Sequence, residues 1–297
     1  MDAGELLRAQ ERLSRAGVQS PAADIKSIAD FVTNGRPLSQ EDMGCVLSLV
    51  ERREKREPIE RIFGKSKFFD LEFELTENIF KPCFETECTT EYALIYAENL
   101  GRQVKILDLG TGTGCILISL LAKLPEAVGV GVDINPESIE LAKRNAQRHG
   151  VSDRATFQLS DWTNDIHETF DIIISNPPRI PEKLISALVR EVAEYDPKEA
   201  LNGGDDGLLF YRRLAADFRR IGKRDAFCVI QAGDIIAEQA KNIFVKNGFS
   251  DVVIRRDYKY SANCITFRNI EKNQSSFVKG PPSIKAMLDK FLNFWWR

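Results

Sequence analysis

From about residue 90 onward, short apolar segments alternate with longer segments whose apolar residues recur at helical spacing. The short segments have the length of buried strands, and the longer ones have the length of helices. Strands that alternate with helices form a mainly parallel sheet covered on both faces, which predicts an α/β fold. The expected strands are residues 104–109, 128–132, 155–159, 171–175 and 227–231, and the expected helices are residues 110–121, 136–149, 208–218 and 235–247.

Two later segments, residues 252–255 and 264–267, are expected to form an antiparallel edge, which gives the sheet seven strands. Residues 269–297 differ in composition, because Asn, Ser, Gly and Pro interrupt any regular element at their start. Residues 284–296 then place apolar side chains on one helical face. We expect a C-terminal tail with an amphipathic helix, which can pack on the body of the same protein, on a partner subunit or on a membrane surface. Packing on the same protein is favoured.

The first sixty residues have helical spacing without intervening strands. Ser39 followed by Asp42 resembles a capping box ahead of an apolar stretch. The charged run at residues 51–57 alternates in sign, so we expect a solvated helix end rather than a nucleic-acid site. Apolar and acidic side chains alternate over residues 71–75, which predicts a strand. The expected organisation is a helical domain at 1–65, a β-hairpin linker at 66–89, an α/β domain at 90–268 and a tail at 269–297.

Composition narrows the classes of protein. The 297 residues include 41 Lys and Arg against 44 Asp and Glu, a net charge of -3, which disfavours a broadly basic nucleic-acid surface. Six Cys and two His residues are too few for a disulfide framework or a zinc site, so we expect no metal centre. No apolar segment approaches the roughly 20 residues that cross a bilayer, and the start does not resemble a secretory signal. We therefore expect a cytoplasmic protein without membrane attachment.

The strongest local signal is the run Asp108-Leu-Gly110-Thr111-Gly112-Thr113-Gly114, at the expected turn from a strand into a helix. Glycine lets the backbone pass close to a ligand and adopt positive φ. Open α/β sheets bind ligands at the carboxyl ends of their strands. Asp133 ends the next expected strand, where a carboxylate can accept both hydroxyls of a ribose. A glycine turn followed by a ribose acid indicates a cofactor that contains adenosine.

The glycine spacing distinguishes two such cofactors. Dinucleotide-binding turns follow G-x-G-x-x-G and hold a pyrophosphate. The spacing here is G-x-G-x-G, and Asp108 stands two positions before the first glycine. An anion at that position disfavours pyrophosphate and favours the ammonium group of a methionine moiety. S-adenosyl-L-methionine (SAM), whose product is S-adenosyl-L-homocysteine (SAH), therefore fits better than NAD.

A second motif, Ser175-Asn176-Pro177-Pro178-Arg179, follows directly after an expected strand. Its prolines restrict φ and hold the backbone carbonyls in set directions. The side-chain carbonyl of Asn176 and the backbone carbonyl of Pro177 can accept both N–H bonds of a planar –NH₂ group. This arrangement positions an amide or an aromatic amine for methyl transfer without a strong base. The expected catalytic residues are Asn176, Pro177, Pro178 and Arg179.

Together with Asp161-Trp162, these motifs resemble the HemK/PrmC family, the release-factor glutamine N5-methyltransferases, and residues 200–208 are also typical of that family. The resemblance implies a class I methyltransferase, Rossmann-like and with a mostly parallel seven-stranded sheet. It also implies SAM-dependent transfer to the glutamine of the Gly-Gly-Gln motif in peptide chain release factors. Residues 110–114 then hold the methionine end, Asp133 the ribose, Trp162 the adenine, and Asn176 with Pro177 the target amide. The implied cofactor-binding residues are Asp108, Gly110, Thr111, Gly112, Thr113, Gly114, Asp133, Asp161, Trp162 and Asn176.

Two positions depart from the family pattern. The family motif N-P-P-Y reads N-P-P-R here, because Arg179 stands where Tyr is usual. The family segment P-R-P-E-T-E reads Pro82-Cys-Phe-Glu-Thr-Glu87, which retains Pro82 and residues 85–87. Both departures fall where a protein substrate is expected to enter, so they bear on substrate identity and on activity.

Three functions remain open. The first is glutamine N5-methylation of release factors by a monomer whose helical domain docks the substrate and which forms no stable complex with nucleic acid. The second keeps the chemistry and changes the acceptor to another protein glutamine or to an exocyclic amine of a nucleobase, which the balanced charge of residues 1–65 disfavours. The third is a SAM-binding protein without turnover, which the two departures favour.

Overall fold

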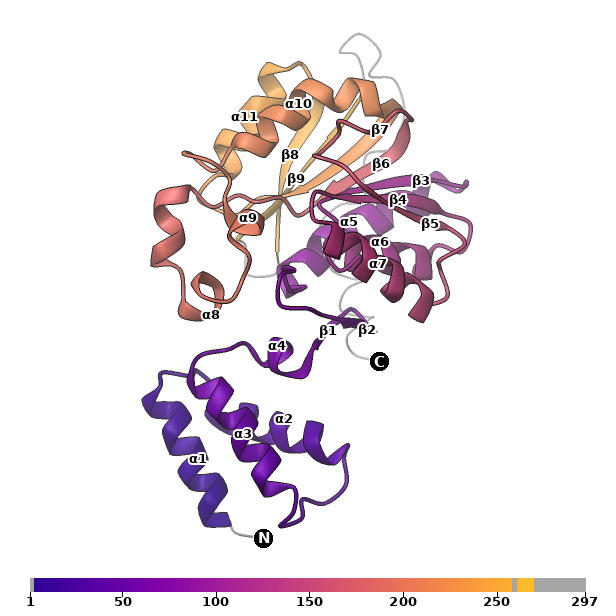
Figure 1. Cartoon of the computed structure of the whole chain (residues 1–297). Helices are drawn as coiled ribbons and strands as arrows, with labels where there is room; N and C mark the ends of the chain where they lie inside the picture. The colour runs from indigo at the N-terminus through magenta and orange to yellow at the C-terminus, as the bar shows by residue number, and fades with distance from the viewer. Residues whose placement is uncertain (1–2, 258–260, 270–297) are drawn as a thin grey trace.

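The computed structural model describes residues 3–257 and 261–269, and Figure 1 shows a helical N-terminal region below a larger α/β body. Leu13, Ile28 and Val46 are fully buried in a core that belongs to the N-terminal region alone. Helical spacing brings such side chains onto one face of each helix, where they pack together. The helices of this region are α1 (Ala3–Arg15), α2 (Pro21–Thr33) and α3 (Met43–Glu54).

Ser39 and Asp42 form the expected capping box ahead of α3. The Ser39 amide donates to Asp42 Oδ2 (2.9 Å), and the Asp42 amide donates back to Ser39 Oγ (3.3 Å). The reciprocal bonds have capping-box geometry but lie in the turn before the helix, because α3 begins at Met43 and the side chain of its N-cap residue, Asp42, makes no hydrogen bond to an amide of the helix. The turn that leads into α3 is therefore encoded locally.

A short helix and a hairpin lead from the helical region to the body, namely α4 (Ile59–Phe63), β1 (Lys65–Phe68) and β2 (Leu71–Glu74). The antiparallel pairing of β1 with β2 confirms the expected strand near residue 71. The hairpin is shorter than the linker expected at residues 66–89, because helix α5 (Phe84–Leu100) begins within that range. Thr86, Thr89 and Thr90 of α5 are buried, so polar residues occupy positions where periodicity requires apolar ones.

The body is built around one seven-stranded sheet in the order β5-β4-β3-β6-β7-β9-β8, which confirms the expected fold class. Its strands are β3 (Lys105–Leu109), β4 (Val128–Asp133), β5 (Ala155–Leu159), β6 (Phe170–Ser175), β7 (Gly222–Gln231), β8 (Ser250–Arg256) and β9 (Ala262–Arg268). The first five are parallel, and β9 is antiparallel to both β7 and β8. The antiparallel strand is therefore inserted one position inside the sheet, and β8 forms the edge.

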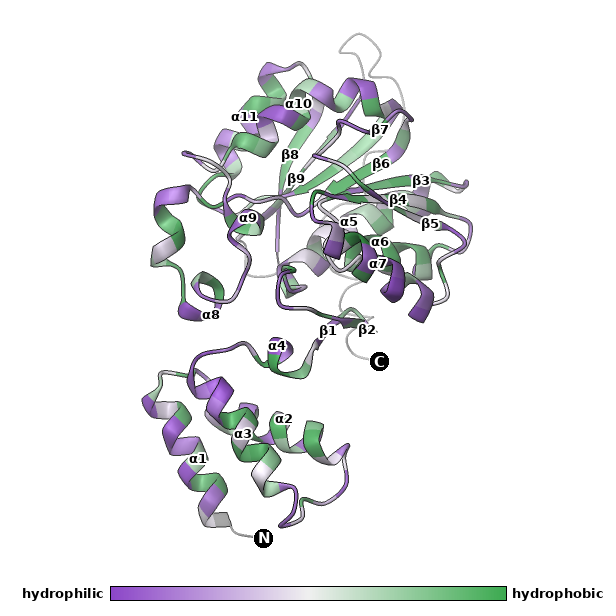
Figure 2. Cartoon of the chain, in the orientation of Figure 1, coloured by the Kyte–Doolittle hydropathy of each residue, from purple (hydrophilic) through white to green (hydrophobic). Residues whose placement is uncertain are grey.

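Helices cover both faces of this sheet (Figure 1). They are α5, α6 (Cys115–Lys123) and α7 (Pro136–Arg148) on one face, and α10 (Leu209–Ile221) and α11 (Ala237–Lys246) on the other. Ile172 and Ile174 of β6 pack on the face covered by α5, α6 and α7, and Ile173 packs on the face covered by α10 and α11. Both faces of the strand are therefore apolar, as the hydrophobic colour of the central strands in Figure 2 shows.

Between β6 and α10 the chain forms a lobe that contains η1 (Glu182–Ala187), α8 (Arg190–Ala193) and α9 (Lys198–Leu201). In the described part of the chain, no helix is both long enough and apolar enough to cross a bilayer. The amphipathic helix expected at residues 284–296 lies outside the described residues.

Candidate active site

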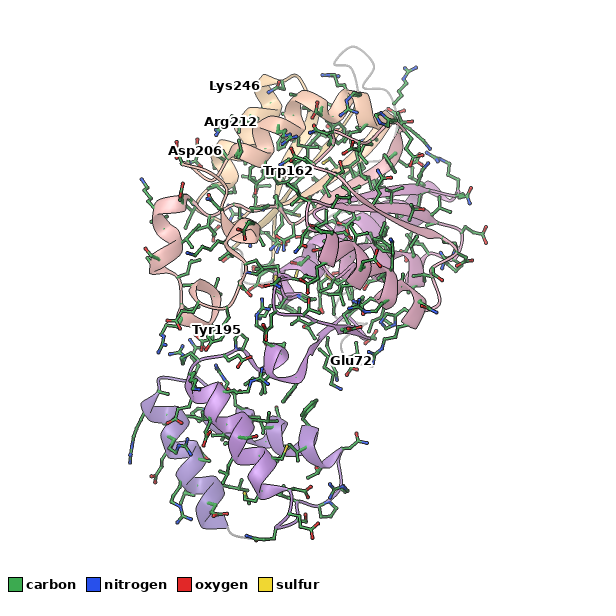
Figure 3. All side chains as sticks on the ribbon, viewed as in Figure 1. Glu72, Trp162, Tyr195, Asp206, Arg212 and Lys246 are labelled. Carbon is green, nitrogen blue, oxygen red and sulfur yellow. The ribbon has the colours of Figure 1, made fainter. Side chains whose placement is uncertain are left out.

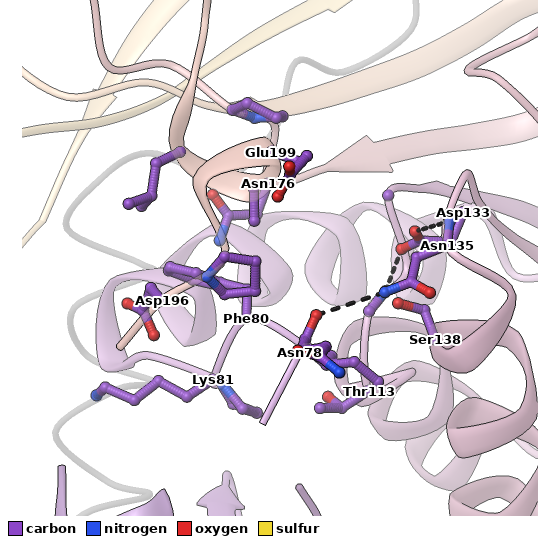
Figure 4. A pocket seen from close by; sticks show the side chains of 18 of the residues that line it. Asn78, Phe80, Lys81, Thr113, Asp133, Asn135, Ser138, Asn176, Asp196 and Glu199 are labelled. Atoms are coloured by element: carbon purple, nitrogen blue, oxygen red, sulfur yellow. Dashed lines mark hydrogen bonds between the residues drawn. The ribbon is translucent and has the colours of Figure 1, made fainter. Parts of the chain in front are cut away.

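The carboxyl ends of β3, β4 and β6 open onto a cleft of about 1660 Å³. Parallel α/β sheets bind ligands at this edge. The cleft extends as far as Arg52 and Arg61 of the N-terminal region, so both parts of the chain line it. Figure 4 shows Asp133, Asn176 and Asp196 among its lining residues.

Most of the expected site residues meet at this cleft. Those that line it are Gly110, Thr111, Gly112, Thr113, Asp133, Asp161, Trp162, Asn176, Pro178 and Arg179. Asp108 of β3 is buried, as are Gly114 in the turn after β3 and Pro177 in the loop after β6. Among residues 3–257 and 261–269, no group of three or more His, Cys, Asp or Glu side chains could hold a metal ion.

The turn after β3 requires glycine for its conformation and for its close packing. Gly110, Gly112 and Gly114 adopt φ values of 73°, 55° and 81°, which L side chains rarely adopt. A Cβ atom at Gly114 would lie 2.7 Å from Ile118 Cδ1 of α6, well inside van der Waals contact. The positive φ and this close contact together favour glycine at the position.

Asp108 supports the turn from beneath. Its side chain is fully buried, and its Oδ2 accepts a hydrogen bond from Thr111 Oγ1 (2.7 Å). Its Oδ1 has no hydrogen-bond partner among the described residues. Burial raises the pKa of Asp108 to about 7, because desolvation disfavours the charged form. Asp108 therefore lies behind the cleft surface, with one oxygen still able to accept a donor.

Asp133 ends β4 with its carboxylate held by two backbone amides. Oδ2 accepts from the Gly112 amide (2.9 Å), and Oδ1 accepts from the Asn135 amide (2.9 Å), as Figure 4 shows in part. Burial raises the pKa of Asp133, and these amide hydrogen bonds oppose the shift. A carboxylate oxygen can accept more than one hydrogen bond, so a group in the cleft can still bind here.

Trp162 forms an aromatic wall of the cleft. Its φ of 58° is rare for a bulky residue, and its ring lies 4.3 Å from that of Phe210. Figure 3 labels Trp162 within the body of the molecule. The carboxylate of the neighbouring Asp161 accepts two hydrogen bonds from Arg213 (3.0 Å each). Of Asp161 and Trp162, the group most available to a ligand is therefore the indole ring of Trp162.

Asn176 is held on both sides of its side-chain amide. Nδ2 donates to Thr86 Oγ1 (3.1 Å), and Oδ1 accepts from Arg179 Nη1 (2.7 Å). A guanidinium group has no acceptor, so the Asn176 atom that faces Arg179 must be the oxygen. Thr86 Oγ1 in turn donates to Gln231 Oε1 (2.8 Å), which extends this chain of hydrogen bonds from α5 to β7.

Residues 200–208 pack against the backbone of Arg179. The Gly203 amide donates to the Ile180 carbonyl (2.9 Å). A Cβ atom at Gly203 would lie 2.9 Å from Arg179 Cα, and one at Gly207 would lie 2.5 Å from the Arg179 carbonyl oxygen. The glycines of this stretch therefore permit the close contact that fixes the loop after β6.

The sequence reasoning missed Thr86 and Gln231 as site residues. Thr86 belongs to the retained segment at residues 85–87, and this retention was the available signal. Gln231 is a polar residue at the end of the apolar strand β7, and both residues are about 2% exposed. A buried polar side chain needs a partner, but local sequence does not indicate which one.

The charged run at residues 51–57 also differs from the expected solvated helix end. Arg53 is buried, and its Nε donates to Asp24 Oδ2 (2.6 Å). Arg56 donates from Nε and Nη2 to the two carboxylate oxygens of Glu191 on α8 (2.6 Å each). The expectation was wrong because long arginine side chains reach other elements, and sign alternation along one helix does not reveal such contacts.

Comparison with known proteins agrees with this architecture. Residues 100–273 match a family model described as a methyltransferase domain. A solved structure, the hMettl16 catalytic domain in complex with MAT2A 3'UTR hairpin 1, has a TM-score of 0.51 and 17% identity, with 91% of this chain and 94% of that chain covered. Together with the strand order and the glycine turn, these matches define the chain as a methyltransferase of the class I fold.

Two curated relatives are release factor glutamine methyltransferases. The one from Rhodospirillum rubrum is 36% identical over 276 residues, with 89% of this chain and 84% of that protein covered. The one from Agrobacterium fabrum is 35% identical over 277 residues, with 89% and 96% covered. The chain belongs to the release factor glutamine methyltransferase family, which confirms the resemblance found in its motifs.

Proposed function

We propose that this chain transfers a methyl group from SAM to the side-chain nitrogen (N5) of the glutamine in the Gly-Gly-Gln motif of peptide chain release factors. The observation that carries the proposal is the orientation of Asn176 in the cleft, with its amide nitrogen bound to Thr86 and its oxygen directed away from it. The glycine turn after β3 and Asp133 at the end of β4 line the same cleft. The names of the two curated relatives support the same acceptor.

The residues around the glycine turn fit SAM. The buried Asp108 Oδ1 lacks a partner among the described residues, so a donor or a positive charge near the turn would stabilise it. Residues 110–114 would hold the methionine end, Asp133 the ribose, and Trp162 with Asp161 the adenine side. SAM, when bound, supplies an electrophilic methyl group and leaves as SAH as the C–N bond forms and the S–CH₃ bond breaks, and the acceptor nitrogen loses one N–H proton to solvent.

The residues of the chain would act on the nitrogen that receives the methyl group. An amide nitrogen is a weak nucleophile because its lone pair is delocalised into the carbonyl. Asn176 Oδ1 would accept one of its N–H bonds, and the Pro177 carbonyl would accept the other. The Pro177 carbonyl accepts no hydrogen bond from any described residue, so it is available. Two accepted N–H bonds orient the nitrogen and raise its electron density.

We also propose that residues 1–65 dock the release factor, because Arg52 and Arg61 of this region line the same cleft. The linker and the methyltransferase domain would then follow at residues 66–89 and 90–268. In this proposal the enzyme acts in the cytoplasm as a monomer and forms no stable complex with nucleic acid.

Methyl transfer from labelled SAM to a purified release factor tests the proposal. We expect label on the glutamine of the Gly-Gly-Gln peptide, located by mass spectrometry after digestion, and its loss in Asn176→Ala. The matched control is Asn99→Ala, because Asn99 is an exposed asparagine on α5 whose side chain, among the described residues, bonds only to the Ile95 carbonyl of the same helix. SAH binding to Asn176→Ala, measured by calorimetry, would show that the variant still folds and binds the cofactor product.

One observation favours a second candidate, a SAM-binding protein without turnover. Arg179 already donates to the Asn176 oxygen that the target amide would use. This candidate predicts SAH binding together with no label in release factor, other protein or RNA. Label in RNA or in another protein glutamine would instead support a different acceptor for the same chemistry.

A further inference from the structure

Among the described residues, the Arg179 side chain has a single hydrogen-bonding partner, Asn176 Oδ1, which is the atom that the proposed acceptor needs. Its Nη1 donates to Asn176 Oδ1 at 2.7 Å. Within the described residues, Arg179 makes no ion pair and no second side-chain hydrogen bond. A guanidinium group carries five N–H donors, so most of those on Arg179 are unmatched by protein.

Residues 200–208 pack closely against the backbone of Arg179. A Cβ atom at Gly203 would lie 2.9 Å from Arg179 Cα, which shows how closely residues 200–208 cover this backbone. The Ile180 amide donates to the Leu201 carbonyl (2.9 Å), and Ile180 bridges to Asn202. The loop after β6 and the end of α9 therefore run beside each other.

Glu199 lies on α9 two residues before Leu201, and it lines the same cleft as Arg179 and Asn176. Figure 4 shows Glu199 and Asn176 in the wall of this cleft. Its carboxylate has no hydrogen bond and no ion pair within the described part of the chain. An unpaired carboxylate is thus available to a guanidinium group that leaves Asn176.

We propose that Arg179 occupies the amide-binding position of the acceptor-free enzyme, and that the target glutamine displaces its guanidinium group from Asn176 Oδ1 toward Glu199. This inference rests on the proposed function, because it concerns the same acceptor site. A charged donor forms a stronger hydrogen bond than the neutral N–H group of an amide. The exchange therefore costs free energy at Asn176, which the ion pair with Glu199 partly offsets. Arg179 accordingly sets how tightly an amide acceptor binds.

The test measures the dissociation constant of a purified release factor in the presence of SAH, which involves no turnover, together with KM and kcat for methylation with labelled SAM. For Arg179→Met, which keeps the length of the side chain and removes its donors, we expect a dissociation constant and a KM that are each roughly tenfold lower. For Arg179→Lys, which retains a charged donor, we expect values close to those of the parent chain.

Glu199→Gln should weaken the binding of the release factor, in contrast to Arg179→Met. Loss of the receiving carboxylate should raise the dissociation constant several-fold in the parent chain, and should have no effect when added to Arg179→Met. The matched control is Arg212→Met, which removes an arginine of α10 whose exposed ion pair with Asp206 lies outside the cleft residues. Figure 3 labels Arg212 and its partner Asp206. We expect Arg212→Met to bind the release factor as the parent chain does.

Melting temperature and SAH affinity, measured on every variant, verify that each protein is folded. An unchanged or weaker affinity of folded Arg179→Met, with a parent chain that methylates the release factor, overturns the inference and leaves the proposed function intact. Absence of release-factor binding and methylation in the parent chain and in all variants overturns the proposed function and the inference with it.

Discussion

Arg61 of α4 and Asp196, which precedes α9, form a buried ion pair between the N-terminal region and the lobe that follows β6. Arg61 Nη2 donates to Asp196 Oδ1 at 2.7 Å, and the two side chains are only 3% and 1% exposed. Arg61 also donates to the carbonyls of Thr76, Glu77 and Ile79. One guanidinium group thus joins three segments that border the cleft.

Replacement of Arg61 by Met should destabilise the protein strongly. The change leaves the Asp196 carboxylate buried without its partner, which typically costs about 3–5 kcal/mol. The check is urea unfolding followed by circular dichroism, and a lower midpoint is expected. Arg12→Met is the control, because the Arg12–Glu54 pair is 38% and 35% exposed and such pairs contribute about 0–1 kcal/mol. Equal midpoints for the two variants would contradict the structural role of Arg61.

Replacement of Thr86 by Val should impair methyl transfer without loss of SAH binding. Valine retains the shape of threonine and removes the oxygen that accepts from Asn176 Nδ2. The Asn176 amide can then rotate, so we expect kcat to fall roughly tenfold, as for the loss of one positioned hydrogen bond.

The control for Thr86 is Thr89→Val on the same helix. Thr89 is equally buried and bonds to Asn263, and it does not contact Asn176. Rates of both variants are compared with their SAH dissociation constants. A similar loss of kcat in both would attribute the effect to α5 as a whole rather than to the orientation of Asn176.

Replacement of Gly203 by Ala should disturb the loop after β6. The added Cβ would lie 2.8 Å from Gly207 Cα and 2.9 Å from Arg179 Cα, so backbone must move on one side. We expect methylation to fall by more than tenfold while SAH binding changes less, because the glycine turn after β3 is a separate loop. Gly44→Ala on α3 is the control, since nothing lies within 4 Å of its added Cβ. A fully active Gly203→Ala variant would argue against close packing at Arg179.

The stability of the protein should depend on the ionisation of Asp108. Burial raises the pKa of Asp108 to about 7, whereas an unfolded aspartate has a pKa of roughly 3.9. The native state then binds this proton more tightly than the unfolded state does. The contribution to stability is therefore complete below about pH 4, and it is lost as the pH rises toward about 7.

For Asp108→Asn, which stays neutral, we expect the free energy of unfolding to decrease less than that of the parent chain between pH 5 and pH 8. Urea unfolding at several pH values in this range measures the difference. Asp205→Asn, at an exposed position, is the control and should follow the parent chain. Parallel curves for Asp108→Asn and the parent chain would show that Asp108 titrates alike in the folded and unfolded states.

The sequence determined by itself those features that depend on neighbouring residues. Alternating apolar segments predicted the seven-stranded α/β sheet, because strand and helix periodicities are local properties. The spacing of Gly110, Gly112 and Gly114 predicted a turn with positive φ for the same reason. Asp133 ends its strand and Asn176 directly follows its own, so the parallel sheet brings them to one edge.

The tertiary structure alone decided which side chains that are distant in the sequence form hydrogen bonds with each other. Thr86 and Asn176 are 90 positions apart, and Arg61 and Asp196 are 135 positions apart, yet each pair forms a hydrogen bond. The burial of three threonines on α5 likewise depends on how distant segments pack, and so does the hydrogen bond from Arg179 to Asn176 Oδ1. Hydrogen-bond partners are selected by the fold because a buried polar group binds whichever donor or acceptor packing brings to it, and periodicity along the chain carries no record of that choice.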